Sequence, residues 1–243
     1  MIPLGKISIH EVYKPQMNRA LTSASTTRIL YNIGGRVLTG PTKVYVVYYG
    51  SWTSTEKNIV NTFIARIGST AWFNITKTYY SKATLTSPKV YIKGPLTLGK
   101  TATDYYSYGT QLIGLSVQNI ILNSISKRQL PSDPNGIYLV LSSADVKESL
   151  STTSSFCNGY CGYHLYFYIG YVPYVYGFIG NPKQCMTHCT VTNRNVSPNG
   201  NPGVDGMLNL IAHELVEAMS DPFVNAWKSP NGNGDIGENA DKW

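Results

Sequence analysis

The stretch that most constrains the fold runs from Gly203 to Pro222 and predicts a single helix. Asp205 is its expected N-cap, and Pro222 ends it because a proline ring excludes the helical conformation from the residue before it. Apolar side chains cover most of the helical cylinder instead of one stripe, so other elements must cover this helix on nearly all sides. These side chains are Met207, Leu208, Leu210, Ile211, Leu215, Val216, Ala218 and Met219.

The same helix carries ionisable side chains into that apolar surface. His213 and Glu217 are four residues apart, so they lie on one face and can reach one ion. Glu214 is offset by about 100° around the helix and can hold a water molecule beside that ion. The spacing is that of the His-Glu-x-x-His metalloprotease helix, with a glutamate in place of the second histidine. Because a carboxylate oxygen binds zinc as an imidazole nitrogen does, the replacement keeps a zinc site.

Two acidic residues further along the chain complete the predicted site. In thermolysin-like zincins a glutamate roughly two dozen residues beyond the motif is the third ligand, and an acid just after it orients the ligands. Glu238 and Asp241 lie at those positions. We therefore expect zinc to be bound by His213, Glu217 and Glu238. Asp241 would orient these ligands, and Glu214 would be the general base. The alternative is a buried hydrogen-bonded network that only locks the helix in place.

Strand and helix patterns alternate along the rest of the chain. Two runs are almost continuously apolar, as expected of strands that are covered on both faces. Thr53 and Glu56 form a capping box that begins a helix. The order predicts an α/β (α+β) fold in which helices pack on a mixed sheet, an arrangement compatible with a zincin-like core. The predicted strands lie at 43–49, 88–93, 136–142, 164–170 and 174–180, and the predicted helices at 53–67, 112–125 and 203–221.

Residues 1–40 are poor in core-forming side chains and are expected to form an arm, with one domain from 41 to 243. Such an arm can pack on its own domain or mediate self-association. Within the domain, residues 94–101 match the P-loop pattern letter for letter. A P-loop needs a helix that begins at its Lys-Thr pair, and no helix pattern follows Lys100 and Thr101. We interpret this segment as a loop without nucleotide chemistry.

The four cysteines form two C-x3-C pairs, Cys157 with Cys161 and Cys185 with Cys189. A zinc knot normally has tighter hooks, so we expect two disulfides formed in an oxidising compartment, with their pairing left open. Two glycosylation sequons, at Asn74 and Asn195, agree with secretion. No apolar run reaches the roughly 18 residues that span a bilayer. The composition therefore favours an exported protein.

The chain has 20 basic and 13 acidic residues, a net charge of +7. This excess favours an acidic partner such as an anionic polysaccharide, and no nucleic-acid motif accompanies it. The alternative is a basic surface that is simply solvated.

Several sequence blocks, in collinear order from about residue 30 to the C-terminus, resemble the EXORDIUM family, which is also called the phosphate-induced protein 1 family. The resemblance implies a secreted protein of the plant apoplast and cell wall that is linked to cell expansion and growth. The blocks are Gly40-Pro41 to Trp52, Asn135 to Leu141, Phe156-Cys157 to His164, Gly180-Asn181 with Gln184-Cys185 to Cys189, Gly203 to Leu215, and Pro222 with Asn225-Ala226-Trp227.

The chain departs from the family pattern in ways that bear on the site. Asp221 stands where many members have asparagine, which adds an acid beside the predicted ligands. The family usually has a cysteine after its Glu-x-x-Asp and then a glycine-rich tail, whereas this sequence ends at Trp243. His164 matches the Cys-Gly-aromatic-His block of the family. It can line the cleft as a substrate contact, or be a hydrogen-bonded histidine beside a disulfide.

Two functions follow from these observations. The first is an extracellular matrix or cell-wall glycoprotein with a structural or assembly role and a metal site. It is slightly favoured because the His-Glu-x-x-Glu motif departs from the commonest active motif. The alternative is a zinc metallopeptidase-like hydrolase that uses His213, Glu214, Glu217 and Glu238.

Overall fold

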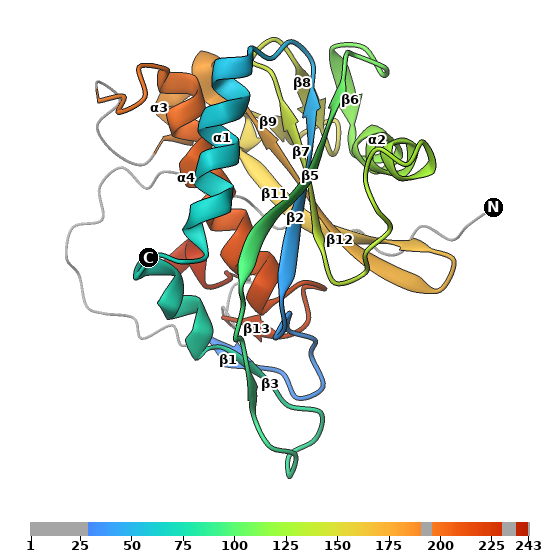
Figure 1. The fold of residues 1–243 in the computed structure, drawn as a ribbon, viewed down its shortest axis with the longest axis vertical. Helices are drawn as coiled ribbons and strands as arrows, with labels where there is room; N and C mark the ends of the chain where they lie inside the picture. Colours follow the sequence, from blue (N-terminus) through green and yellow to red (C-terminus); the bar gives the residue numbers. More distant parts are fainter. Residues whose placement is uncertain (1–28, 191–195, 230–236, 243) are drawn as a thin grey trace.

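The computed structural model describes residues 29–190, 196–229 and 237–242. At its centre is a five-stranded sheet in the order β11-β12-β7-β2-β5 (Figure 1). Neighbouring strands from β12 to β5 are parallel, and only the edge strand β11 is antiparallel to its neighbour β12. The expected mixed sheet is thus confirmed. The strands span Gly162–Ile169 (β11), Val172–Gly180 (β12), Ile137–Ser142 (β7), Thr42–Tyr49 (β2) and Leu96–Asp104 (β5).

Helices cover both faces of this sheet, which explains why β2 and β7 are apolar along almost their whole length (Figure 1). Helices α1 (Ser54–Ile67) and α4 (Pro202–Ser220) pack against each other on one face, and α2 (Gly114–Ser126) packs against β7 and β2 on the other. The predicted capping box of α1 is confirmed. The Thr53 hydroxyl accepts a hydrogen bond from the Glu56 amide, and the Glu56 carboxylate accepts one from the Thr53 amide.

The start of α4 differs from the expectation. Asn201, not Asp205, is the N-cap, and its side-chain oxygen accepts a hydrogen bond from the Val204 amide at 3.2 Å. Pro202 then occupies the first helical turn, where its fixed backbone angle favours the helix. Asp205 lies within the first turn, and its carboxylate binds the preceding loop at Ser197 and Asn199. The helix ends at Ser220, with Asp221 as C-cap before the proline, as expected.

Most of the segment that matches the P-loop pattern, residues 96–101, belongs to strand β5, so the interpretation as a loop was wrong for these residues. No helix begins at Lys100 and Thr101, which agrees with the exclusion of a P-loop. Lys100 and Thr101 lie inside this strand, which pairs in parallel with β2. Gly99 is needed for packing, because a Cβ atom there would lie 2.6 Å from the ring of Tyr45. A Cβ at Gly136 would lie 2.5 Å from the same ring. The two glycines thus make room for one buried tyrosine.

Two disulfides join Cys157 to Cys185 and Cys161 to Cys189, so the expectation of oxidised cysteines agrees with the structure. They fasten the segment of β9 (Ser155–Phe156) and β10 (Gly159–Tyr160) to η2 (Pro182–Gln184) and α3 (Met186–Cys189). Strands β9 and β10 extend a small second sheet with β8 (Lys147–Ser149) and β6 (Gln111–Ile113).

The described part of the predicted arm packs on the domain. Strand β1 (Leu30–Tyr31) pairs antiparallel with β13 (Trp227–Lys228), and the side chains of Val37 and Leu38 are buried in the core. The Leu38 amide donates a hydrogen bond to the carbonyl of Met219, the residue before the end of α4. Residues 30–40 are therefore part of the folded unit.

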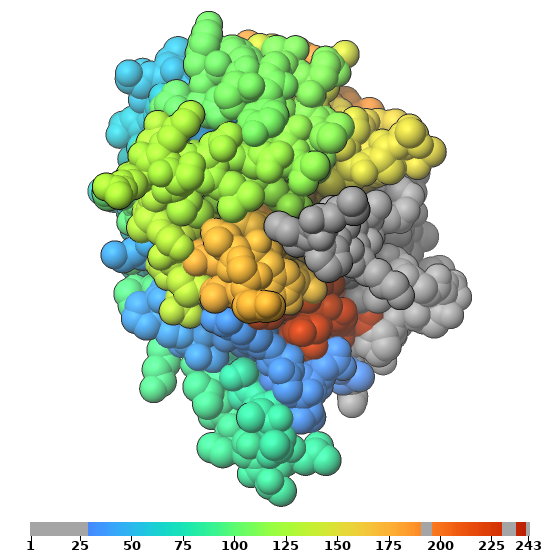
Figure 2. All heavy atoms as spheres, turned by 90° about the vertical axis from the view of Figure 1, so that its right-hand side faces the viewer, coloured from blue at the N-terminus to red at the C-terminus, as the bar shows by residue number. Residues whose placement is uncertain are grey.

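The remaining elements form one end of the molecule and the C-terminus. Helix η1 (Trp72–Thr78) leads into a hairpin of β3 (Tyr80–Ser81) and β4 (Val90–Tyr91), which projects at the lower end (Figures 1 and 2). The short helix η3 (Ala240–Lys242) lies near the C-terminus. Asn74 is exposed in η1, whereas Asn195 lies outside the described residues, so glycosylation stays a prediction. None of the described helices combines the length and apolarity needed to cross a membrane.

Candidate metal centre

The fold brings the predicted site residues together where α4 meets strand β11 and the C-terminal segment. His213, Glu214 and Glu217 come from the middle of this helix, and His164 comes from the edge strand β11 that packs against it. Acidic residues reach the same place from the end of α4 and from the C-terminal segment; they are Asp221, Glu238 and Asp241.

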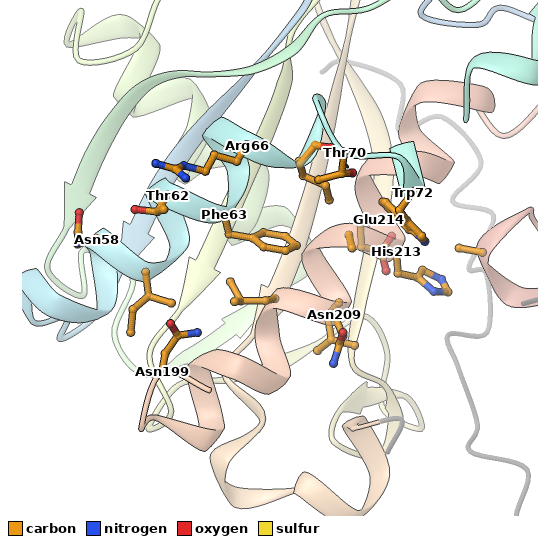
Figure 3. A pocket seen from close by; sticks show the side chains of 16 residues that line it. Asn58, Thr62, Phe63, Arg66, Thr70, Trp72, Asn199, Asn209, His213 and Glu214 are labelled. Carbon is orange, nitrogen blue, oxygen red and sulfur yellow. Dashed lines mark hydrogen bonds between the residues drawn. The ribbon is translucent and has the colours of Figure 1, made fainter. Parts of the chain in front are cut away.

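The first group of possible ligands is centred on His213, whose side chain projects from α4 next to that of Glu214 (Figure 3). The Nε2 atom of His213 lies 3.3 Å from Oε1 of Glu217 and 3.4 Å from Oδ1 of Asp241. His213 and Asp241 are partly exposed, whereas Glu217 is buried. This group therefore lies at the border between the interior and the solvent.

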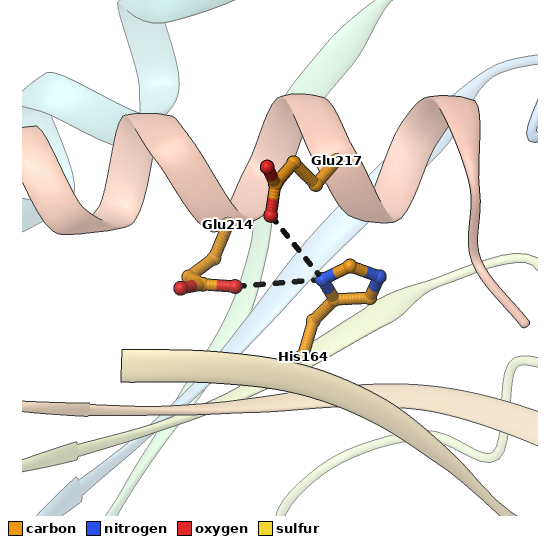
Figure 4. A group of neighbouring side chains, drawn as sticks. All are labelled: His164, Glu214 and Glu217. Carbon is orange, nitrogen blue, oxygen red and sulfur yellow. Dashed lines mark ion pairs between the residues drawn. The ribbon is translucent and has the colours of Figure 1, made fainter. Parts of the chain in front are cut away.

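The second group is centred on His164 and is fully buried (Figure 4). Its Nδ1 atom lies 3.4 Å from Oε2 of Glu214 and 3.9 Å from Oε2 of Glu217. On the other side of the ring, Nε2 lies 3.2 Å from the carbonyl oxygen of Asp221 and 3.8 Å from Oε1 of Glu238. Both groups therefore share Glu217, which contributes one carboxylate oxygen to each.

The distances within these groups fit a tetrahedral zinc ion. Two ligand atoms that are each about 2.1 Å from such an ion lie roughly 3.4 Å apart. The closest contacts of His213 with Glu217 and Asp241, and of His164 with Glu214, are 3.3, 3.4 and 3.4 Å. Imidazole nitrogen and carboxylate oxygen are both ligands that zinc accepts. The cluster can hold a metal ion.

The charges of the cluster also favour a cation. Five carboxyl groups face two imidazoles, and burial of unbalanced carboxylates is costly. Three of their buried oxygens accept no hydrogen bond from the described residues: Oε1 of Glu217, Oδ2 of Asp221 and Oε1 of Glu238. A metal ion would supply both the missing positive charge and a partner for such oxygens.

The protonation of these groups reflects the same imbalance. Burial raises the pKa of Glu238 well above its ordinary value, although the nearby His164 opposes this shift. Burial alone would lower the pKa of His164, but Glu238, Glu214 and Glu217 outweigh it and raise the value to about 10. Without a metal ion, the cluster therefore keeps protons that an ion would displace.

A pocket of about 850 Å³ leads to the site between α1 and α4. Asn58 and Asn199 lie at one end, and Trp72, His213 and Glu214 lie at the other (Figure 3). Between them the walls are mainly apolar, with Phe63, Leu208 and Leu210 among the lining residues. The pocket gives a ligand of moderate size access to the face of the helix that carries the motif.

The structure arranges the predicted ligands in a specific way. Glu238 lies beside His164, and Asp241 lies beside His213, although the sequence predicted Glu238 as a ligand together with His213. Asp221 holds the turn after α4, because its Oδ1 accepts hydrogen bonds from the amides of Asn225 and Ala226. Which acid binds an ion stays a prediction.

The sequence predicted that His164 either lines the cleft or forms a hydrogen bond beside a disulfide. In the structure it is not among the residues that line the pocket, and it lies buried at the centre of the second group. Gly162 makes room on the same face of β11, since a Cβ atom there would lie 3.3 Å from Oε1 of Glu214. A glycine two positions before a histidine in an otherwise aromatic strand was the available sequence signal. By itself this spacing does not indicate which helix packs on the face of β11 that carries His164.

The comparison with known proteins places this site in a family. Residues 30–241 match the family model described as "Phosphate-induced protein 1 conserved region". The chain belongs to the phosphate-induced protein 1, or EXORDIUM, family. The matched residues include every member of the candidate metal centre, so the site lies within the region that defines the family.

Several relatives show how much of an EXORDIUM-family protein this chain spans. Protein EXORDIUM-like 3 of Arabidopsis thaliana is 32% identical over 230 residues, which are 84% of this chain and 65% of that protein. Protein EXORDIUM-like 5 of the same plant is 30% identical over 84% of this chain and 61% of its own length. Protein PHOSPHATE-INDUCED 1 of Nicotiana tabacum is 26% identical over 86% of this chain and 70% of its own length. The chain thus spans less than two thirds of the first two relatives. No solved structure matches it.

Proposed function

We propose that this EXORDIUM-family chain is an exported zinc-binding protein whose site acts as a hydrolytic centre of the metallopeptidase type. The observation that carries the proposal is the pocket that ends on His213 and Glu214. A purely structural zinc site is closed by protein ligands, whereas a catalytic site keeps a position open to water and substrate. The two disulfides support export to an extracellular or cell-wall location.

The proposed ligands are His213, which lines one end of the pocket, and Glu217 and Asp241, which lie 3.3 and 3.4 Å from its Nε2 atom. A zinc ion bound there would polarise a substrate carbonyl and activate a water molecule. Glu238, the other candidate ligand, lies on the far side of His164. An antiparallel edge strand beside the motif helix supports the zincin-like arrangement that the motif implies.

The remaining residues of the site would position groups and move a proton. Glu214 borders the pocket, where its carboxylate can accept a proton from water that is attacking a carbonyl. His164 lies 3.4 Å from Glu214 and 3.9 Å from Glu217, so it holds both carboxylates from behind. The apolar walls of the pocket would favour a substrate with apolar side chains next to the cleaved bond.

The second candidate is the structural or assembly role of a matrix or cell-wall glycoprotein. The group around His164 favours it, because its buried side chains join α4, the sheet and the C-terminal segment. In that case the ion would stabilise the fold, and the N-terminal arm would mediate self-association.

Elemental analysis of native protein, purified without chelator, tests the metal site. We expect about one zinc ion per chain, and loss of this ion in His213→Ala. Comparison of Asp241→Asn with Glu238→Gln identifies the third ligand, because only substitution of the residue that binds zinc should lower the zinc content. Native protein without bound metal would contradict both candidate functions as stated.

Peptide cleavage separates the two candidates. Against a broad peptide library, we expect metal-dependent cleavage by the wild type and a loss of roughly 10²–10⁴ in rate for Glu214→Gln, because an amide cannot accept the proton. Glu148→Gln, which changes a buried carboxyl outside the site, is the matched control and should cleave normally. A wild type that binds zinc but cleaves nothing would favour the structural role.

A further inference from the structure

The whole net charge of the protein resides in one segment of the chain. Residues 57–103 contain seven of the 20 lysines and arginines and none of the 13 acidic residues. The rest of the chain has 13 basic and 13 acidic residues and is neutral overall. A stretch of this length without any acid favours this segment for contact with an anion.

Part of this segment, the hairpin of β3 and β4, lies where a large partner can reach it. The hairpin of β3 and β4 projects from the lower end of the molecule, beyond the main sheet (Figures 1 and 2). Lys89 and Lys93, which flank β4, are exposed, and Lys82 follows β3. No carboxylate of another described residue forms an ion pair with these three lysines.

Aromatic rings lie between these charges and are held in fixed positions. Tyr91 is 45% exposed, and its ring packs edge-on against Tyr80 at 5.5 Å between centroids. Tyr80 in turn packs against Trp227 at 4.9 Å, and the ammonium group of Lys89 lies 4.3 Å from the centre of the Tyr80 ring. The Trp227 indole donates a hydrogen bond to the Tyr80 carbonyl at 2.8 Å, which fixes the base of the hairpin. The surface thus combines rigid rings with cations.

We infer that this hairpin surface, defined by Lys82, Lys89, Tyr91 and Lys93, binds a carboxylate-bearing polysaccharide. A sugar ring presents a face of C–H groups that packs on an aromatic ring, and each uronic acid unit carries one carboxylate for a lysine. A chain of such units matches single lysines separated by aromatic and polar residues. Nucleic acid carries a denser charge, one per about 1.7 Å along the duplex, and sites for it typically have clustered lysines and arginines.

The binding experiment uses polygalacturonate as the probe, and dextran as the neutral control polymer. We expect the full chain to bind polygalacturonate but not dextran, and binding to weaken by about tenfold or more between 50 and 200 mM salt, since added salt screens exposed charges. Lys89→Gln combined with Lys93→Gln should weaken binding at least about tenfold. Lys127→Gln combined with Lys147→Gln removes the same charge from exposed sites outside the segment, and should change binding less than about twofold.

A second pair of variants tests the aromatic contact. Tyr91→Ser should weaken binding several-fold even at high salt, whereas Tyr171→Ser, at the fully exposed turn after β11, should not. Equal losses in both lysine pairs would mean a response to net charge alone and would overturn the inference. Equal binding of dextran, no binding, or tighter binding of a single-stranded polynucleotide at equal charge concentration would also overturn it. His213→Ala should bind normally, so this result is independent of the zinc proposal.

Discussion

At the scale of single residues, Glu217 connects the two halves of the candidate metal centre. Its Oε1 lies 3.3 Å from His213, and its Oε2 lies 3.9 Å from His164. It is buried, and its Oε1 accepts no hydrogen bond from the described residues. No other carboxylate of the cluster belongs to both groups of possible ligands. Glu217 is therefore the one carboxylate of the described cluster that a metal ion in either group could contact.

We predict that Glu217→Gln abolishes the stabilisation of the protein by zinc. At a zinc concentration of 100 times the dissociation constant, binding to the native state adds about 2.7 kcal/mol to the free energy of unfolding. For a chain of this size that raises the melting temperature by roughly 5–10 °C. Thermal unfolding of metal-free protein with and without added zinc measures the shift. The Glu148→Gln variant should show the same rise in melting temperature as the wild type. The same rise in Glu217→Gln would show that Glu217 is not a zinc ligand.

A second buried carboxyl lies outside the metal centre, on the opposite face of β11. Glu148 is completely buried, and its carboxylate oxygens accept hydrogen bonds from the hydroxyls of Tyr160 and Tyr163. Burial raises the pKa of Glu148 from 4.5 to about 7, although both hydrogen bonds oppose this shift. Tyr176, the other titratable group near it, has a pKa that burial raises to about 12, so it stays neutral.

Glu148 should therefore make the protein less stable as the pH rises. Its unfolded pKa lies below its folded pKa, so its stabilising contribution is complete below about pH 4.5 and is lost as the pH rises through about 7. We expect the wild type to lose roughly 1–3 kcal/mol more than Glu148→Gln between pH 4.5 and 8. Urea unfolding of both proteins at each pH measures the difference and cancels the contributions of other groups. A constant difference across this range would contradict the assignment.

At the scale of elements, the two disulfides constrain the same two segments of the chain. Both bridges span 28 positions, and the loops they close overlap from Cys161 to Cys185. Once either bridge is formed, the other closes only a short ring. This ring consists of residues 157–161, residues 185–189 and the two bridges between them. Chain entropy therefore makes the second bridge worth less than the first. Together they hold β9 and β10 beside α3, next to the strand that carries His164.

We predict that the two bridges stabilise the protein in a non-additive way. Replacing one pair of bonded cysteines by alanine should lower the free energy of unfolding by roughly 3 kcal/mol, because the remaining bridge still closes the long loop. Replacing both pairs should cost about 1 kcal/mol more than the sum of the two separate losses. Urea unfolding of the four proteins tests this. Losses that add within error would mean that the bridges constrain the unfolded chain independently.

At the scale of the whole molecule, the fold extends further towards the N-terminus than residue 41. Val37 and Leu38 are buried, and β1 closes against β13 close to the end of α4. These contacts hold the end of α4 and the segment after it, which carry part of the candidate metal centre.

Two truncations separate stability from assembly. A chain that begins at residue 29 keeps every contact that the structure describes and serves as the reference. A chain that begins at residue 41 should lose at least about 3 kcal/mol, because two buried aliphatic side chains each contribute roughly 1.5–3 kcal/mol. Light scattering of the first truncation tests whether residues 1–28 mediate self-association. Equal stability of both truncations would show that residues 30–40 do not contribute to the core.

The sequence alone determined the features that depend on local geometry. The spacing of His213 and Glu217 on one helix face, the capping box at Thr53 and the buried runs of β2 and β7 all follow from the periods of helix and strand, which do not change with the surroundings. The even number of cysteines similarly indicated disulfides but not their pairing. These features were enough for the fold class and for one half of the candidate site.

Only the tertiary structure decided which distant residues meet the helix. His164 joins the cluster because β11 is the edge strand that packs on α4, and Asp241, not Glu238, lies beside His213 because of the path of the C-terminal segment. The start of α4 at Asn201 likewise depends on Glu56 of α1, whose carboxylate accepts a hydrogen bond from the Asn201 side chain. Distances within one helix are set by its fixed geometry, but distances between elements are set by the packing of the whole core, which no local pattern encodes.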